Sequence, residues 1–434
     1  MQRFEKYSGY KDSGVDWIGE IPAGWEVKSI KHVTVKIGSG VTPSGGGTTY
    51  LNEGIPLLRS QNIHFGKIDL EDVARISSNV HMSMLNSHVH RGDVLLNITG
   101  GSIGRCHYVT SDYPMNVNQH VCIIRPSKQI QTKFLNAIMT SEIGQGQIWF
   151  HQQGGGREGL NFQSLKNFML PFPPFPEQTA IANFLDEKTT KIDTAISQKE
   201  EMIALLKERK QILIQKAVTK GIDPDAQMKD SGVEWIGEIP ESWEVKRFKN
   251  LFLQSKLPPS KTDGVVTSYR DGQVTLRSNR RMDGYTEAIL EHGYQGVRKG
   301  QLVLNSMDAF AGAIGVSESD GKCTPEYVVC GAIDDSVSSE YFSYLLREMA
   351  LAKYIQVICN AVRQRAIRIR FSKLSRLFFI VPPLQEQIAI VDFIETESAK
   401  IETSITLQQQ QITKLKEYKS ILIDNAVTGK IKVC

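Results

Sequence analysis

The sequence of 434 residues has few of the features that mark a secreted or a membrane protein. Its six cysteines are scattered without a C-x-x-C spacing, which in a chain of this length predicts reduced thiols rather than a disulfide framework. No apolar run approaches the roughly 18 residues of a membrane span, and the first residues contain no apolar signal segment. The net charge is only +4, so no strong basic field indicates a nucleic-acid partner. We therefore expect a soluble, cytoplasmic protein that makes no membrane contact.

Catalytic signatures are also absent. The sequence contains no G-x-x-x-x-G-K-[ST] phosphate loop, and no Asn/Asp-Pro-Pro-aromatic stretch beside a glycine-rich cofactor loop, as an adenine methyltransferase needs. Residues 154–159 match G-x-G-x-x-G but follow a polar stretch instead of a strand, which favours a surface loop over a dinucleotide site. His88 and His90 alternate on an extended segment without a further ligand at metal spacing, which favours an exposed strand edge. The sequence predicts no catalytic residue and no metal site.

What the chain does contain is a long stretch that occurs twice. Residues 173–221 begin Pro-Pro-Phe-Pro-Glu-Gln and end Ala-Val-Thr-Lys-Gly; residues 382–430 begin Pro-Pro-Leu-Gln-Glu-Gln and end Ala-Val-Thr-Gly-Lys, an offset of 209 residues. Neither copy has an internal proline or glycine after the Glu-Gln pair. About forty residues can therefore stay helical, far more than the usual 11–12 or so. The repeat predicts two long helices.

Apolar residues in both copies recur at alternating steps of three and four, as a coiled-coil seam requires. Eight of eleven seam positions are apolar in each copy, and the polar interruptions match: Thr189 and Ser398, Lys199 and Gln408, Lys210 and Lys419. Matching seams with matching interruptions favour two helices that pack on each other, rather than a lone amphipathic helix on a globular core. The predicted seam residues are Leu185, Ile192, Ile196, Ile203, Leu206, Leu213, Ile394, Ile401, Ile405, Ile412, Leu415 and Leu422. A second apolar stripe on the first helix is left over (Phe184, Ala195, Met202, Leu205, Ile212), and it could face another part of this chain or a partner protein.

A second repeat precedes each variable part of the chain. Residues 11–28 and 229–246 are identical at 15 of 18 positions, at an offset of 218 residues, and both contain Trp-x-Gly-x-Ile-Pro-x-x-Trp. Two tryptophans around Ile-Pro indicate a short clamp that packs on neighbouring structure. The order of clamp, variable block and long helix, repeated once, predicts a pseudo-twofold molecule with antiparallel long helices.

The two variable blocks, about residues 29–172 and 247–381, share one short pattern. It reads Arg-Gly-Asp-Val-Leu-Leu-Asn at 91–97 and Lys-Gly-Gln-Leu-Val-Leu-Asn at 299–305, each followed by a glycine-bearing turn. Both blocks are therefore expected to be α/β (α+β) modules with a small mixed or antiparallel sheet. We predict four segments: 1–172, the first clamp and block; 173–222, the central long helix; 223–381, the second clamp and block; and 382–434, the C-terminal long helix.

Polar and basic side chains of the blocks gather in predicted loops. Arginine commonly reads guanine, asparagine and glutamine read adenine, and serine, threonine and lysine hold phosphates. Taken singly, each run is best explained as a solvated loop, but two such surfaces on a duplicated frame favour DNA contact. The candidate DNA-binding residues are Thr42, Ser44, Thr48, Thr49, Tyr50, Arg59, Gln61, Asn62, Gln152, Gln153, Arg157, Arg277, Ser278, Asn279, Arg280, Arg281, Arg363, Gln364, Arg365, Arg368 and Arg370.

These features together resemble the specificity (S) subunits of Type I restriction-modification systems. The resemblance is carried by the Pro-Pro-x-x-Glu-Gln entries at 173–178 and 382–387, by Gly-Asp-Val-Leu-Leu at 92–96, and by the two tryptophan clamps. It implies two α/β target-recognition domains, separated by two long antiparallel coiled-coil helices. Each domain would read one half of a bipartite, asymmetric DNA target.

The resemblance also implies a set of partners. They are double-stranded DNA, two methyltransferase (M) subunits docked on the helices, and restriction or motor (R) subunits held through the M subunits. The chain itself would be non-catalytic and would carry no cofactor, with S-adenosylmethionine, ATP and Mg on the partners. The assembled complex would be a DNA adenine methyltransferase and an ATP-dependent endonuclease.

Two other interpretations are kept open by the residues alone. A protein-interaction scaffold without DNA contact is favoured by the low net charge and opposed by the Arg, Asn and Gln content of the loops. An autonomous nuclease would need a metal or cofactor site that the sequence does not reveal.

Overall fold

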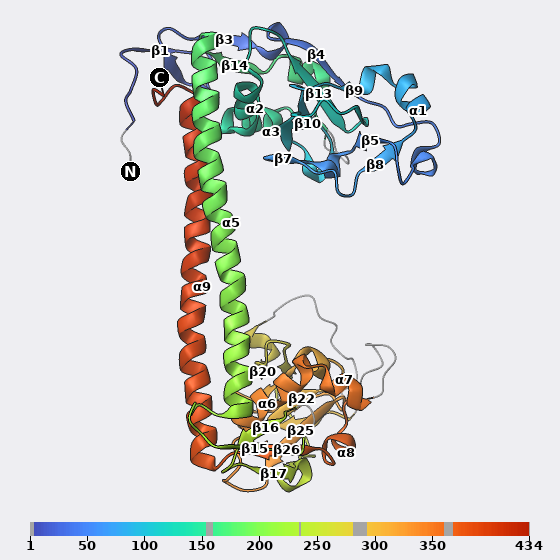
Figure 1. Ribbon diagram of the computed structural model, residues 1–434, viewed down its shortest axis with the longest axis vertical. Coiled ribbons are helices and arrows are strands. Elements are labelled where there is room, and N and C mark those ends of the chain that lie inside the picture. Colours follow the sequence, from blue (N-terminus) through green and yellow to red (C-terminus); the bar gives the residue numbers. More distant parts are fainter. Residues whose placement is uncertain (1–3, 153–158, 234–235, 281–292, 360–367, 434) are drawn as a thin grey trace. The chain divides into compact units, whose positions relative to one another are not determined.

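The structure is a computed structural model that describes residues 4–152, 159–233, 236–280, 293–359 and 368–433. The chain forms two compact units: Met1–Glu200 with Gln409–Cys434, and Glu201–Gln408. We call them the first and the second unit and describe each by itself (Figure 1). In the described part of the chain, no helix combines the length and the apolar composition of a membrane span.

The first unit is built on two four-stranded sheets. One has the order β11-β10-β13-β4 and is antiparallel throughout; the other has the order β8-β5-β12-β9, with β12 and β5 parallel. The strands of these sheets are β4 Thr34–Ser39, β5 Ile55–Leu58, β8 Ala74–Ile76, β9 His88–Val89, β10 Val94–Asn97, β11 Cys106–Tyr108, β12 Met115–Val117 and β13 Val121–Pro126. Strand β10 is buried along its whole length because apolar residues of both sheets cover it, among them Leu58, Val117 and Ile123.

Short ladders and helices complete the first unit. The ladders are β1 Tyr10–Asp12 with β2 Glu20–Pro22, β3 Glu26–Ser29 with β14 Met169–Phe172, and β6 Ile63–His64 with β7 Lys67–Ile68. The helices are α1 Ser78–Ser83, α2 Thr132–Thr140, α3 Glu142–Phe150 and α4 Phe162–Lys166, and the 3-10 turns are η1 Ile30–His32, η2 Gly46–Thr49, η3 Ser60–Asn62, η4 Leu85–Ser87 and η5 Gly100–Ser102.

The second unit repeats this plan with a smaller outer layer. Its main sheet has the order β18-β25-β22-β23, which matches β4-β13-β10-β11 strand for strand. Its strands are β15 Met228–Asp230, β16 Glu238–Pro240, β17 Glu244–Arg247, β18 Phe252–Gln254, β19 Val266–Ser268, β20 Val274–Leu276, β21 Gln295–Val297, β22 Leu302–Asn305, β23 Ile314–Val316, β24 Gly321–Cys323, β25 Tyr327–Ala332 and β26 Phe378–Val381. Its helices are α6 Ser339–Leu351, α7 Tyr354–Cys359 and α8 Phe371–Leu374, with turns η6 Phe248–Asn250, η7 Arg277–Asn279 and η8 Ala309–Ala311. The predicted α/β class and the internal repeat are thus confirmed.

The two long helices are α5 Phe175–Lys220, of 46 residues, and α9 Leu384–Val427, of 44 residues. In the first unit Lys419 of α9 donates to Asp193 of α5 at 2.7 Å, and in the second unit Lys210 of α5 donates to Glu402 of α9 at 2.8 Å. Within the first unit Lys199 of α5 also donates to Gln411 of α9, so the partner on α9 moves from residue 419 to residue 411 as the α5 residue moves from 193 to 199, and the helices are antiparallel. The predicted seam lies on the buried side: Ile203, Leu206, Leu213 and Leu415 are half-buried and the other eight seam residues are buried.

A buried glutamine fixes the start of each long helix to its own unit. Gln178 accepts a hydrogen bond from the Gln131 backbone N–H at 2.9 Å, and its amide donates to the Pro173 and Gln129 carbonyl oxygens. Gln387 repeats this arrangement, accepting from Ser338 N–H at 2.8 Å and donating to two carbonyl oxygens. The glutamine of each Pro-Pro-x-x-Glu-Gln stretch therefore hydrogen-bonds to backbone groups directly before the first turn of a domain helix, α2 in the first unit and α6 in the second.

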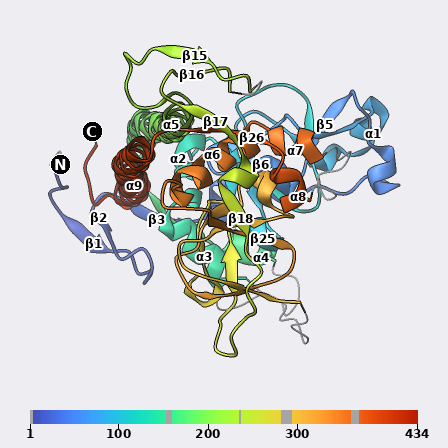
Figure 2. The same cartoon turned by 90° about the horizontal axis from the view of Figure 1, so that it is seen from below.

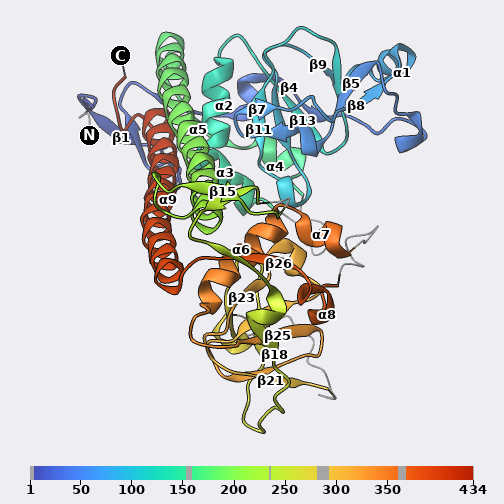
Figure 3. The ribbon, with the colours of Figure 1, turned by 60° about the horizontal axis from the view of Figure 1, so that its bottom comes forward.

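Each clamp packs against the end of a long helix. In the first unit, Trp25 is 1% exposed and lies beside Gly429, which follows α9 with a φ of 73°. In the second unit, Trp243 is fully buried beside Gly221, which follows α5 with a φ of 78°. Figures 2 and 3 show the hairpin β15-β16 beside α5, and Figure 2 shows β1-β2 beside α9. A side chain at either glycine would be strained by the left-handed backbone and would meet the clamp.

Candidate nucleic-acid interface

In the first unit, the candidate residues gather at the turn after β5. The turn η3 follows Arg59 directly, and Asn62 closes it: the Arg59 N–H donates to Asn62 Oδ1 at 3.0 Å, and Asn62 Nδ2 donates to the Asp69 carbonyl at 3.1 Å. Asn97, the last residue of β10, donates to the Ser60 carbonyl at 2.8 Å and so holds the turn against the main sheet. Asn62 is only 3% exposed and its amide is used internally. Asn62 therefore has a structural role in closing the turn, and its predicted contact with DNA stays a prediction.

The neighbouring residues of this turn are better placed for a ligand. Gln61 is exposed, and the Arg59 guanidinium lies over the Tyr50 ring, 5.7 Å from its centre. The Arg59 Nε atom is buried without a hydrogen-bond partner among the described residues. A buried guanidinium N–H normally has an acceptor, so Arg59 has unused donor capacity.

A polar chain that sequence reasoning missed lies on the adjacent loops. Thr42 donates to the Gln119 side-chain oxygen, and the Gln119 amide donates to His120 Nε2 at 3.1 Å. The imidazole proton is then on Nδ1, which donates to Thr99 Oγ1 at 2.7 Å. Ser44, two residues after Thr42, is exposed. The polar triplet Asn-Gln-His at 118–120, directly before the buried strand β13, was a visible signal for it.

The turn after β20 in the second unit corresponds to the turn after β5. Residues 276–280 read Leu-Arg-Ser-Asn-Arg and residues 58–62 read Leu-Arg-Ser-Gln-Asn, at the same offset of 218 residues as the clamps. Both segments end a strand and continue into a 3-10 turn, η7 and η3. The two recognition turns, residues 58–62 and 276–280, are therefore equivalent elements with divergent side chains.

In the second recognition turn, the polar groups are ordered by the β19-β20 hairpin. Arg277 Nε donates to Thr267 Oγ1 at 3.4 Å, and Asn279 Nδ2 donates to Thr275 Oγ1 at 3.0 Å, while Ser278 lies on the same turn. Arg280 is exposed and lies over the Tyr269 ring, 4.1 Å from its centre. A hollow of about 460 Å³ opens here, lined by Thr267, Ser268, Tyr269, Arg270, Asp271, Arg280, Asn305 and Asp308.

The described part of the second basic run lies next to this hollow. Ser306 follows the hollow-lining Asn305, and its hydroxyl donates to the Ile369 carbonyl at 2.7 Å. Arg370 is exposed, and Arg368 pairs with Glu326 at 3.5 Å. The structure thus brings the region of Arg368 and Arg370 close to the turn that carries Arg280.

Several candidate residues cannot be placed. Gln153, Arg157, Arg281, Arg363, Gln364 and Arg365 lie outside the described residues, as do the side chains of Thr48 and Thr49. Gln152 is half-buried at the end of the described segment that follows α3. The predicted contacts of these residues stay predictions.

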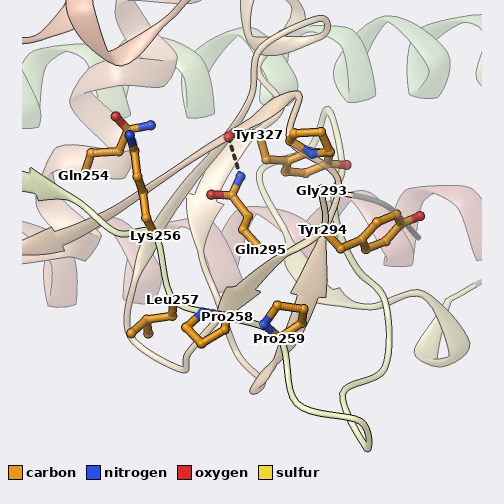
Figure 4. Close-up of a pocket in the computed structure, with 10 residues that line it drawn as sticks. Gln254, Lys256, Leu257, Pro258, Pro259, Gly293, Tyr294, Gln295 and Tyr327 are labelled. Carbon is orange, nitrogen blue, oxygen red and sulfur yellow. Dashed lines mark hydrogen bonds between the residues drawn. The ribbon is translucent and has the colours of Figure 1, made fainter. Parts of the chain in front are cut away.

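A second hollow of the same unit contains none of the candidate residues (Figure 4). It has a volume of about 480 Å³ and is lined by Gln254, Lys256, Leu257, Pro258, Pro259, Gly293, Tyr294, Gln295, Pro325 and Tyr327. Gln295 Nε2 donates to the Tyr327 carbonyl at 2.7 Å, and burial raises the pKa of the Tyr327 hydroxyl to about 12. The tyrosine therefore stays neutral and contributes no charge to this surface.

The shared Gly-Asp/Gln pattern before β10 and β22 has a structural role. Asp93 is 1% exposed; it accepts from the His90 N–H and from Arg125 at 2.7 Å each, and this pair raises the pKa of the Arg125 guanidinium. In the second unit, Gln301 accepts from the Arg298 N–H at 2.8 Å, and Gly331 stands where Arg125 stands in the first. Gln301 thus keeps the turn bond to the backbone N–H three residues earlier. The ion pair of Asp93 with Arg125 has no counterpart there, because glutamine is uncharged and a glycine replaces the arginine.

His88 and His90 lie at the edge strand β9, His88 within it and His90 directly after it. His88 belongs to β9, stacks on His81 with ring centres 3.9 Å apart, and contacts the His81 carbonyl. Burial is the largest cause of a lowered pKa at His90, followed by the charge of Arg125. Within the described segments, no group of three or more His, Cys, Asp or Glu side chains could hold a metal ion.

Comparisons with known proteins agree on one family. A family model described as the type I restriction modification DNA specificity domain matches residues 22–203. The chain is 24% identical over 463 residues to the putative type I restriction enzyme MjaX specificity subunit of Methanocaldococcus jannaschii, covering 100% of this chain and 99% of that protein. It is 20% identical over 424 residues to the type I restriction enzyme StySPI specificity subunit of Salmonella potsdam, covering 95% and 90%.

Solved structures share the fold. A chain solved in work on complex assembly and conformational transition of the type I R-M system matches with a TM-score of 0.66 at 15% identity, covering 94% of this chain and 98% of that one. The HsdS subunit from Thermoanaerobacter tengcongensis matches with a TM-score of 0.55 at 16% identity, covering 95% and 98%. At such identities these matches establish the architecture only.

Proposed function

Because the chain belongs to the specificity subunits of type I restriction-modification systems, we propose that each unit binds one half of a bipartite DNA target through its recognition turn. Specificity subunits are non-catalytic, so the chain selects the site at which its partners act. The observation that carries the proposal is the pair of equivalent recognition turns, Leu-Arg-Ser-Gln-Asn and Leu-Arg-Ser-Asn-Arg, on one repeated scaffold. A duplicated frame with divergent turns suits an asymmetric target.

The chemistry of these turns suits DNA. Arginine and amide side chains read base edges in the major groove, and hydroxyl and basic groups hold phosphates. Gln61, Arg59 and Arg280 present such groups from the turns themselves. The low net charge of +4 means that affinity for DNA depends on these local groups and on the partners rather than on a global field.

We further propose that two M subunits dock on the long helices. Ile212 of α5 and Ile421 of α9 are 43% and 57% exposed, and they are equivalent positions at the offset of 209 residues. Met202 and Leu205, in the left-over apolar stripe of α5, are also about half exposed, at 48% and 53%. An exposed apolar position that recurs at equivalent places in both units fits two copies of a partner better than one. S-adenosylmethionine, ATP and Mg would be bound by the M and R subunits, and the complex would work in the cytoplasm.

Methylation mapping tests the function directly. Cells that carry this gene together with its neighbouring methyltransferase gene are sequenced by a single-molecule method that detects N6-methyladenine. We expect a bipartite motif with two specified halves around an unspecified gap, and its loss when this gene alone is deleted. With the methyltransferase shown to be active, the absence of any motif that depends on this gene would favour the protein-interaction scaffold instead.

A further inference from the structure

Arg280 is held in one orientation by three groups of its own hairpin. Its guanidinium lies over the Tyr269 ring at 4.1 Å, and its Nη1 atom donates to Asp271 Oδ1 at 3.0 Å and forms an ion pair with Oδ2 at 2.8 Å. Nη1 also donates to the Gln273 side-chain oxygen at 3.3 Å. Stacking on an aromatic ring and pairing with a carboxylate both restrict the rotamers of a long side chain. Arg280 is therefore preorganised before any ligand binds.

These contacts leave one edge of the guanidinium available. The contacts with Asp271 and Gln273 both involve Nη1, while Nε and Nη2 have no hydrogen-bond partner among the described residues. The N–H groups of Nε and Nη2 on that edge are parallel and can donate to two acceptors at once. The side chain is 36% exposed and lines the hollow of about 460 Å³. The side chain that carries these paired donors thus borders the hollow.

The charges around the hollow select the kind of acceptor. Asp271 and Asp308 both line it, and Asp308 pairs with Arg270 at 2.9 Å. Two carboxylates beside the arginines oppose the approach of a phosphate, which carries a negative charge of its own. The major-groove edge of guanine is uncharged and presents two acceptors, O6 and N7, at the spacing of a bidentate arginine.

We propose that Arg280 is the guanine-reading residue of the second unit, with Nε–H and Nη2–H donating to O6 and N7 of one guanine in the second half-site. This inference rests on the proposed function of the chain. Tyr269 and Asp271 act as positioning residues, because they hold the guanidinium and do not themselves reach the base. At the corresponding position of the first unit, Asn62 is buried in its own turn, so that position supplies no equivalent reader.

The test uses the full chain in complex with its methyltransferase partner. The probe is a DNA duplex carrying the motif found by methylation mapping, in which each guanine of the second half-site is replaced in turn by 7-deazaguanine, which lacks the N7 acceptor. We expect the wild-type complex to lose affinity at one guanine, by about tenfold to a hundredfold. R280A and R280K should bind the unmodified motif more weakly by a similar factor. Replacing that guanine by 7-deazaguanine should then cause no further loss of affinity in either variant.

Two controls separate reading from folding and from charge. R247A removes an exposed arginine that lies 5.2 Å over Phe378, a similar stack outside the hollow, and should bind like the wild type. Y269F keeps the ring and should also bind like the wild type. Y269A should weaken binding at the same guanine, because it frees the Arg280 side chain.

Two results would overturn the inference while leaving the proposed function intact. One is an R280A complex that still loses the full wild-type factor at every 7-deazaguanine position. The other is an R280A complex that is weakened equally on the motif and on an unrelated duplex, with a shallower salt dependence, as expected for a phosphate contact. A wild-type complex that does not prefer the motif over the unrelated duplex would instead contradict the proposed function.

Discussion

Lys419 donates to both carboxylate oxygens of Asp193, each at 2.7 Å, and the same pair recurs as Lys210 and Glu402 at 2.8 Å. Lys210 and Lys419 are 209 residues apart, as are Asp193 and Glu402, so each unit contains one copy of a single ion pair. Exposed pairs of this kind contribute only about 0–1 kcal/mol. Their main effect is on register and orientation, which charges at the edge of a coiled coil determine. The polar interruptions of the seam therefore specify how the helices pair.

The apolar seam should provide most of the helix pairing energy. Ile405 is 4% exposed on α9, whereas Leu407, two residues along the same helix, is 51% exposed. We expect I405A to lower the free energy of unfolding of the full chain by about 2–5 kcal/mol, because it opens a cavity in the seam. L407A should change it by less than about 0.5 kcal/mol. Urea unfolding followed by circular dichroism measures both, and equal effects would argue against the seam.

The long helices could be predicted because the spacing of their apolar residues by itself determines which residues share one helix face. Ile401, Ile405 and Ile412 recur at coiled-coil spacing, and no tertiary information is needed to place them on one face. The loop residues have no such period. Asn62 and Gln61 look alike in sequence, yet one is buried and the other exposed, because the Asp69 carbonyl happens to lie within reach of Asn62. Burial of a loop side chain depends on contacts that the local sequence does not encode.

The internal repeats pointed to structurally important residues that could not be recognised one at a time. The structural meaning of Gln178 and Gln387 comes from their identical sets of three hydrogen bonds, which no propensity predicts. The Gln119–His120 chain was missed because it is present in one unit only and has no repeat to mark it. A repeat therefore drew attention to Gln178 and Gln387, whereas the local signal at residues 118–120 had no second copy to support it.

Replacing Gln387 should loosen the joint between α9 and the second unit. Gln387 is fully buried, and a leucine there would leave the Ser338 N–H and the Ser336 and Pro382 carbonyl oxygens without partners. We expect Q387L to cost at least about 2 kcal/mol, since each buried unsatisfied group costs about 1–3 kcal/mol. Gln385 is exposed in the same turn, so Q385L is a matched control with little effect. If thermal unfolding shifts equally for the two variants, the joint does not depend on these bonds.

The clamp of the first unit can be tested at Gly429. A Cβ there would lie 2.4 Å from Pro22 Cγ and 3.1 Å from the Trp25 ring, on a backbone with φ of 73°. Gly19, in the same clamp, has φ of 71° but open space around it. G19A should therefore cost only the left-handed strain of about 1–2 kcal/mol, and G429A clearly more. Thermal unfolding followed by tryptophan fluorescence measures the difference, and equal costs would mean that the clamp does not pack tightly on the end of α9.

Glu348 should make the stability of the second unit depend on pH. It is 6% exposed on α6, and burial raises its pKa to about 7, although Gln211 Nε2 of α5 donates to it at 2.6 Å. The folded state therefore holds a proton that the unfolded state releases near pH 4.5, so the free energy of unfolding falls as the pH rises from about 4.5 to about 7.

The variant E348Q keeps an acceptor for Gln211 and removes the titration. We expect it to stabilise the chain at pH 8, by an amount on the order of 2 kcal/mol, and to have little effect at pH 4.5. Glu340 lies exposed in the first turn of the same helix, so E340Q provides the control without this pH dependence. Urea unfolding across pH 4.5–8 measures all three proteins. If the wild type and E348Q gave parallel profiles, Glu348 would be ionised in the folded state, and the raised pKa would be wrong.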